Sequence, residues 1–137
     1  MIELVPLCVA ELGIGRAFDL GTTPAGRRLI GLADGGRFDG DRLHAKVAAV
    51  GADWLVIGPD GTGLVDARLL LETDEGALIH VTYQGRVDTT GGMRGPFYTA
   101  PLFETAANDY AWLNRVVAVA KGIVDGRTLR YEMFELH

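Results

Sequence analysis

Serine is absent from this 137-residue sequence, and cysteine occurs only once, as Cys8. A chain without serine cannot build a Ser–His–Asp catalytic triad, and one cysteine cannot form a disulfide within the chain. The histidines His44, His80 and His137 do not stand at the spacings to other ligands that are typical of zinc or non-haem iron sites. The sequence therefore predicts no metal site, and the lone cysteine favours the cytoplasm as the compartment.

Long apolar runs and nucleotide-binding motifs are also missing. The longest uninterrupted apolar run covers residues 116–120, whereas a membrane-spanning helix needs about 20 apolar residues. The first residues include Glu3 and no basic segment, so we expect no secretory signal. Gly13 and Gly15 lack the third glycine of a dinucleotide-binding loop, and no glycine run leads into a Gly-Lys-Thr sequence. We expect no cofactor and no membrane segment.

Composition and charge describe an ordinary globular chain. Hydrophobic residues make up 48% and charged residues 23%, and a chain of this length predicts one domain over residues 1–137. Thirteen basic and eighteen acidic residues give a net charge of −5, which repels phosphate backbones, so we expect no nucleic-acid partner. The mean hydropathy is +0.17, which indicates that a partner covers some apolar surface. We therefore predict a homo-oligomer.

Apolar and polar residues alternate with a period of two along most of the sequence, and turn residues such as Asp125-Gly126 interrupt them at short intervals. Strands are predicted over residues 3–11, 27–33, 42–50, 54–57, 64–73, 78–87, 97–105, 112–124 and 128–136. One helical turn fits within residues 106–113. This pattern predicts an all-β fold, an antiparallel meander of about 8–9 strands closed into a barrel or stacked as a sandwich.

Several polar or aromatic side chains stand in or beside apolar rows of the predicted strands. They are Asp53, Trp54, Arg68, Tyr83, Tyr98, Glu104, Trp112 and Asn114. In one interpretation they form ion pairs, rim contacts and ordinary core aromatics. In the other, a set of them converges inside a barrel, as polar groups on an apolar pocket that holds one small ligand. A carboxyl group buried in such a pocket has a raised pKa and can act as a general acid or base near neutrality.

Motifs spread over most of the chain carry a family resemblance. The most specific are Gly-Ala-Asp-Trp at residues 51–54, Thr-Ala-Pro-Leu-Phe-Glu at residues 99–104 and Trp-Leu-Asn at residues 112–114. In these motifs the chain resembles the DUF3237 (UPF0311) family of small bacterial and fungal proteins. The resemblance implies a closed antiparallel β-barrel, but it brings no established reaction.

Three functions remain open from the sequence. The first is binding of a small hydrophobic or aromatic molecule inside the barrel, with ligand contacts from Tyr83, Tyr98, Trp112, Asn114, Trp54 and Arg68. The second is a cofactor-free isomerase, lyase or cyclase in which Glu104 or Asp53 transfers a proton. The third is a structural or oligomeric interaction module.

Overall fold

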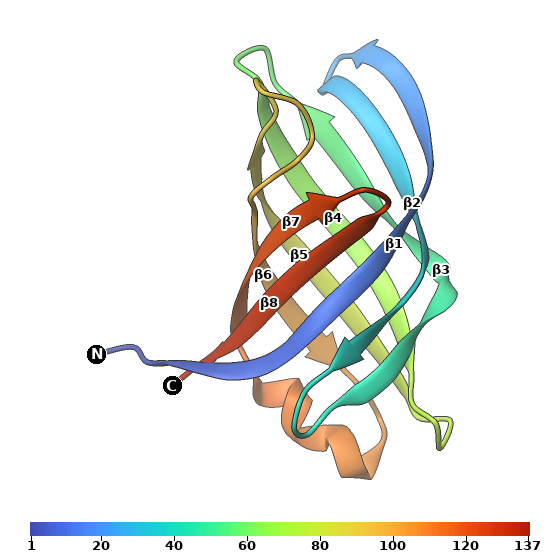
Figure 1. Cartoon of the computed structure of the whole chain (residues 1–137), viewed down its shortest axis with the longest axis vertical. Coiled ribbons are helices and arrows are strands. Elements are labelled where there is room, and N and C mark those ends of the chain that lie inside the picture. Colours follow the sequence, from blue (N-terminus) through green and yellow to red (C-terminus); the bar gives the residue numbers. More distant parts are fainter.

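Eight antiparallel strands form a closed barrel in the computed structural model, which describes residues 1–137 (Figure 1). Each strand pairs with its neighbours in the sequence, and β1 pairs with β8 to close the barrel. The elements are β1 (Leu4–Thr23), β2 (Gly26–Asp39), β3 (His44–Ile57), β4 (Thr62–Glu72), β5 (Leu78–Asp88), β6 (Phe97–Glu104), the 3-10 helix η1 (Asn108–Arg115), β7 (Ala118–Asp125) and β8 (Thr128–Leu136). The predicted all-β antiparallel barrel is confirmed. No helix in the structure is both long enough and apolar enough to cross a membrane.

The β1–β2 hairpin is longer than the two strands predicted for it. The prediction is too short because bulges interrupt the alternation of apolar and polar residues on which it depends. The sequence predicts that the first strand ends at residue 11, whereas β1 continues to a turn near residue 24. The register between β1 and β2 shifts between Leu12 and Ile14 and again beyond Ile14. A Cβ atom at Gly13 would clash with the carbonyl oxygen of Asp34 on β2. The two backbones therefore need glycine at this close approach.

Strand β3 joins two segments that the sequence predicts as separate strands, residues 42–50 and 54–57. Its register against β4 shifts between Val47 and Gly51, as expected for a bulge. Beyond the bulge, Asp53 pairs with Ala67 of β4, whose side chain is fully buried inside the barrel. Because cross-strand partners share a face of the sheet, the Asp53 side chain points inward.

One end of the barrel is closed by η1, which lies in the connection between β6 and β7 (Figure 1). Leu113 of η1 and Leu43 of the β2–β3 connection are fully buried at this end. Arg42 stacks its guanidinium carbon 3.9 Å from the ring centroid of Trp112 and forms an ion pair with the buried carboxylate of Glu135. These contacts pack η1 and the β2–β3 connection against this end of the barrel.

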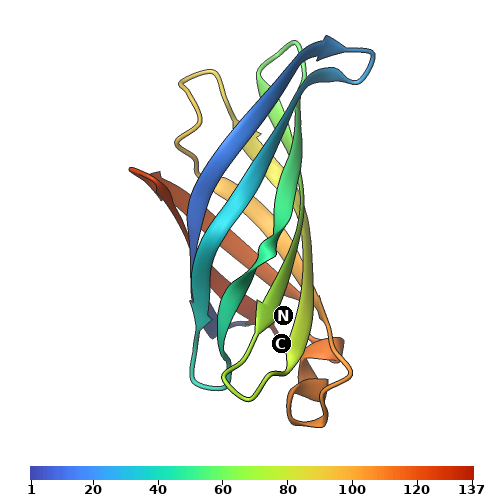
Figure 2. The same ribbon diagram turned by 90° about the vertical axis from the view of Figure 1, so that its right-hand side faces the viewer.

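The other end of the barrel carries the turns that join β1 to β2, β3 to β4, β5 to β6 and β7 to β8. Figure 2 shows that the tip of the β7–β8 hairpin bends away from the barrel axis at this end. No helix covers the opening, since η1 lies at the opposite end. The end opposite η1 therefore has no helix across it, and we call it the open end of the barrel.

Candidate functional site

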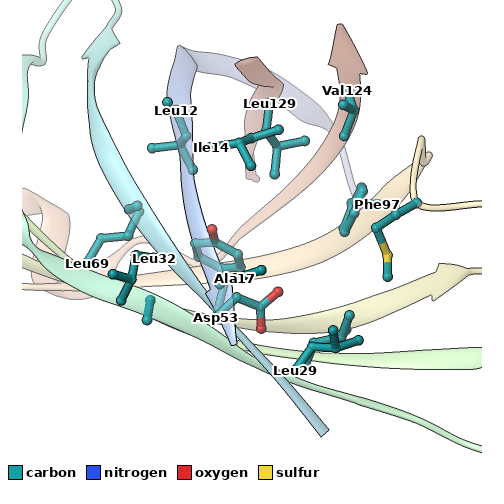
Figure 3. Close-up of a pocket in the computed structure, with 17 residues that line it drawn as sticks. Leu12, Ile14, Ala17, Leu29, Leu32, Asp53, Leu69, Phe97, Val124 and Leu129 are labelled. Carbon is teal, nitrogen blue, oxygen red and sulfur yellow. The ribbon is translucent and has the colours of Figure 1, made fainter. Parts of the chain in front are cut away.

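The open end of the barrel contains a pocket with a volume of about 390 Å³. Of the 17 residues that line the pocket, 14 are hydrophobic, and Asp53 is the only one with a charged side chain. Figure 3 shows the Asp53 carboxyl group among aliphatic and aromatic side chains. The labelled lining residues are Leu12, Ile14, Ala17, Leu29, Leu32, Asp53, Leu69, Phe97, Val124 and Leu129. This size and composition suit one small, largely apolar molecule.

The space beside Asp53 results from small side chains on the neighbouring strands. Asp53 pairs with Gly31 of β2 on one side and with Ala67 of β4 on the other. Ala17 of β1 lies beyond Gly31, and Tyr83 of β5 lies beyond Ala67. We call these five residues the Asp53 layer. A Cβ atom added at Gly31 would have no other atom within 4 Å, so the Asp53 layer borders open space inside the pocket.

The two oxygens of the Asp53 carboxyl group have different surroundings. Oδ1 accepts a hydrogen bond from the backbone N–H of Asp66 at 3.0 Å, whereas Oδ2 makes no hydrogen bond within the protein. No arginine, lysine or histidine lines the pocket, and Asp53 takes part in no ion pair. Burial raises the pKa of Asp53 to about 6, and the nearby charge of Asp66 adds to this effect, while the Asp66 N–H opposes it. Oδ2 is therefore the carboxyl oxygen that is left without a partner and is available to accept a proton.

Tyr83 supplies the only hydroxyl group of the pocket lining. Its ring contacts Tyr131 of β8 edge to face, with 5.6 Å between the ring centroids. Burial raises the pKa of both phenols well above the usual range, and the negative charge of Asp53 raises the pKa of each further. Both hydroxyl groups therefore stay protonated near neutral pH. Near neutral pH the protonated Tyr83 phenol in the pocket lining is thus a hydrogen-bond donor and not a general base.

A family model described as "Protein of unknown function (DUF3237)" matches residues 2–136 of the chain. The chain belongs to the DUF3237 family. The family resemblance predicted from the sequence motifs is thereby confirmed. The family description itself includes no reaction or ligand.

The relatives of this chain include proteins that are named as enzymes and proteins that are not. A UPF0311 protein of Rhodopseudomonas palustris is 30% identical over 106 residues, which cover 64% of this chain and 65% of that protein, so the match spans less than two thirds of its length. A "beta-barrel like protein" from Acinetobacter baumannii has a crystal structure with a TM-score of 0.89 and 32% identity, covering 100% of this chain and 97% of that chain. The "Hydroalkoxylation enzyme phnH" of Penicillium herquei is 33% identical over 88 residues, covering 64% of this chain and 49% of the enzyme. The last of these is an enzyme by name.

Glu104, one of the two predicted catalytic residues, lies on β6 with its side chain on the outer face of the barrel. Its side chain is 82% exposed, and its Oε1 lies 3.2 Å from Nδ1 of His80. Tyr98 of the same row is 55% exposed. The row of β6 that faces inward consists of Phe97, Thr99, Pro101 and Phe103. The predicted inward position of Glu104 and Tyr98 is therefore wrong. These two residues alternate with the inward-facing row, and the apolar residues of their own row face outward too.

Trp112 and Asn114 belong to η1 at the closed end and not to a strand. The sequence predicts a strand over residues 112–124, whereas β7 begins at Ala118. The Asn114 side chain accepts a hydrogen bond from the backbone N–H of Thr105 at 2.8 Å and donates one to its carbonyl oxygen at 3.0 Å. Trp112 lies under Arg42. Both residues hold η1 against the barrel, far from the pocket, and the prediction that they line it is wrong.

Trp54 and Arg68 lie on the outer face of β3 and β4. Trp54 follows the inward-facing Asp53, so its ring points outward, where it is 38% exposed. The Arg68 guanidinium carbon lies 6.0 Å from the Trp54 ring centroid. Of the eight residues predicted for the site, the structure brings only Asp53 and Tyr83 together in the pocket wall.

Most of the pocket wall comes from residues that the sequence analysis does not identify as candidate site residues. Leu12, Ile14 and Ala17 belong to the part of β1 beyond the predicted strand. Met93 belongs to the connection between β5 and β6. The one sequence signal near them is the glycine pattern at Gly13 and Gly15, which marks the bulged hairpin. No group of three or more His, Cys, Asp or Glu side chains is placed to share a metal ion. The chemistry of the pocket therefore depends on Asp53 and Tyr83.

Proposed function

We propose that this protein is a general acid–base enzyme that binds a small, largely apolar molecule in the barrel and transfers a proton through Asp53. The observation that supports this proposal is the carboxyl group of Asp53, which lies in a hydrophobic pocket with Oδ2 free of any hydrogen bond. With a pKa of about 6, about a tenth of the Asp53 side chains carry a proton at pH 7. Both the acid and the base are thus present near neutrality.

The name of the Penicillium relative favours one reaction class. Hydroalkoxylation adds the oxygen and hydrogen of a hydroxyl group across a carbon–carbon double bond. In this chain, Oδ2 of Asp53 gives its proton to one alkene carbon, and the alkene π electrons form the new C–H bond. A lone pair of the substrate hydroxyl oxygen forms the bond to the other carbon, and the hydroxyl proton returns to the Asp53 carboxylate. Tyr83 donates a hydrogen bond that orients the substrate oxygen.

The test uses an alkenyl phenol, 2-(3-methylbut-2-enyl)phenol, incubated with the purified protein in D2O. We expect a cyclic ether that carries one deuterium on carbon, detected by mass spectrometry. Asp53→Asn should lower turnover by about 100-fold or more, because it removes the acid. Glu104→Gln is the matched control, since it removes an exposed carboxyl group outside the pocket. Equal turnover by the wild-type protein and Asp53→Asn would contradict the proposal.

Deuterium on carbon without ether formation would point to the isomerase reaction in place of addition. Both outcomes require the same proton transfer by Asp53. Binding of the phenol with neither product nor deuterium exchange would favour a carrier.

A further inference from the structure

The pocket contains one negative charge and no positive charge to balance it. We propose that it selects uncharged, largely hydrocarbon molecules, and that each molecule bound brings one proton onto Asp53. This inference rests on the proposed function, because it names the substrate class and the charge state of the same site.

Two arginines on the strands beside Asp53, Arg28 and Arg68, make their contacts outside the pocket lining. Arg28 donates a hydrogen bond to the carbonyl oxygen of Trp54 at 2.9 Å, and the Arg68 guanidinium lies near the Trp54 ring on the outer face. A carboxylate, sulfonate or phosphate inside the pocket would lose its water and find no cation there, while it faced the Asp53 carboxylate. An anionic group is therefore excluded from the part of the ligand that enters.

The groups that face Asp53 leave its charge dependent on water. Gly31 on β2 and Ala67 on β4 have no polar side chain, and Tyr83 on β5 and Tyr131 on β8 stay neutral. The Asp66 N–H binds Oδ1, and the negative charge of the Asp66 carboxylate nearby disfavours ionised Asp53 further. Because Oδ2 has no hydrogen-bond partner in the protein, its negative charge depends on hydration from the open end of the pocket. A hydrocarbon that displaces this water disfavours the carboxylate and favours the acid.

Proton uptake makes ligand affinity depend on pH in one direction. Below the pKa of free Asp53 the acid is already present, so affinity is highest there. Affinity then falls as pH rises, by about tenfold per pH unit, up to the higher pKa that Asp53 has in the complex. The bound substrate thereby meets Asp53 as an acid, which is the form that protonates an alkene carbon.

The experiment uses two fluorescent probes with the same aromatic skeleton. N-phenyl-1-naphthylamine is uncharged between pH 5 and pH 8, and 8-anilino-1-naphthalenesulfonate adds one sulfonate. We expect the neutral probe to bind the wild-type protein at least about tenfold more tightly at pH 5 than at pH 8. The neutral probe should also bind at least about tenfold more tightly than the sulfonate at pH 8. Asp53→Asn should bind the neutral probe with the same affinity at both pH values, and Glu104→Gln should behave like the wild type.

Gly31→Leu locates the probe, since a side chain at Gly31 enters the open space of the pocket. It should weaken binding of the neutral probe at least about tenfold at pH 5. A loss of this size is expected because the added aliphatic side chain occupies space that the probe needs. Gly91→Leu is the matched control, because a Cβ atom there also meets no atom within 4 Å and Gly91 lies outside the pocket lining. The inference is overturned if the wild type binds the neutral probe equally at both pH values, or if the pH dependence survives in Asp53→Asn. Tighter binding of the sulfonate than of the neutral probe overturns it as well. So does a wild type that does not bind the neutral probe, or binding that Gly31→Leu leaves unchanged. Deuterium on carbon measures the proposed enzyme activity separately, so failure of this inference and failure of the proposed function give different results.

Discussion

Replacing Asp53 with asparagine is expected to stabilise the protein at neutral pH while it removes the proposed acid. Burial raises the pKa of Asp53 from 3.8 to about 6, so the folded protein holds this proton more tightly than the unfolded chain does. The free energy of unfolding therefore falls as pH rises from about 4 to about 6 and stays lowered above that range. Asparagine has no proton to lose and keeps an oxygen that can accept the Asp66 N–H.

The magnitude follows from the size of the pKa change. One pKa unit corresponds to about 1.4 kcal/mol, so a rise of about two units costs the wild type about 3 kcal/mol above pH 7. Asp53→Asn removes this cost, and we expect a gain of up to about 3 kcal/mol at pH 8. At pH 4 the difference between the variant and the wild type should shrink to about 1 kcal/mol or less, because the folded wild type is then protonated.

Urea unfolding at several pH values, followed by the fluorescence of Trp54 and Trp112, measures both differences. Glu104→Gln serves as the control for removal of a carboxyl group, and its free energy of unfolding should stay within about 0.5 kcal/mol of the wild type throughout. A stability difference between Asp53→Asn and the wild type that does not change between pH 4 and pH 8 would refute the reasoning. It would mean that burial does not disfavour the Asp53 carboxylate.

Other predictions concern the closed end, the pocket and the assembly. Leu113→Ala removes a fully buried side chain of η1 and should lower the free energy of unfolding by about 3 kcal/mol in urea titrations. A loss below about 1 kcal/mol would contradict the packing of this end. Asn114→Ala removes two hydrogen bonds to the backbone of Thr105 and should cost about 1 to 2 kcal/mol in the same assay, with no change in neutral-probe binding. Gly31→Leu should leave the melting temperature within a few degrees of the wild type, because the new side chain meets open space, and a large drop in calorimetry would argue against that space. The homo-oligomer remains a prediction, which light scattering supports if the mass exceeds 14.7 kDa and contradicts if it does not.

The sequence predicts the barrel and two of its pocket residues because strand alternation is regular around them. Asp53 stands in one row with Leu55, and Tyr83 in one row with Ile79 and Val81; these neighbours of Asp53 and Tyr83 are buried in the structure. The same rule fails for Glu104. Its row contains apolar residues such as Leu102, which is 51% exposed, so an apolar row does not distinguish the two faces of this sheet.

The remaining errors come from a change of period and from bulges. Trp112 and Asn114 lie in a 3-10 helix, where side chains repeat every three residues, so a row with a period of two has no meaning there. Leu12 and Ile14 lie across a register shift, which conceals the alternation of the long β1–β2 hairpin. Because this hairpin supplies much of the wall, the sequence predicts that a pocket can exist but does not predict its lining.

The most direct test of the central claim is a pH titration of the Asp53 carboxyl carbon by carbon-13 NMR, with the signal assigned through its loss in Asp53→Asn. We predict a pKa of about 6 for the free protein. Saturation with N-phenyl-1-naphthylamine should raise it further. A pKa near 4 that the probe leaves unchanged would show that Asp53 is an ordinary hydrated carboxylate, and it would contradict the acid–base function assigned to the pocket.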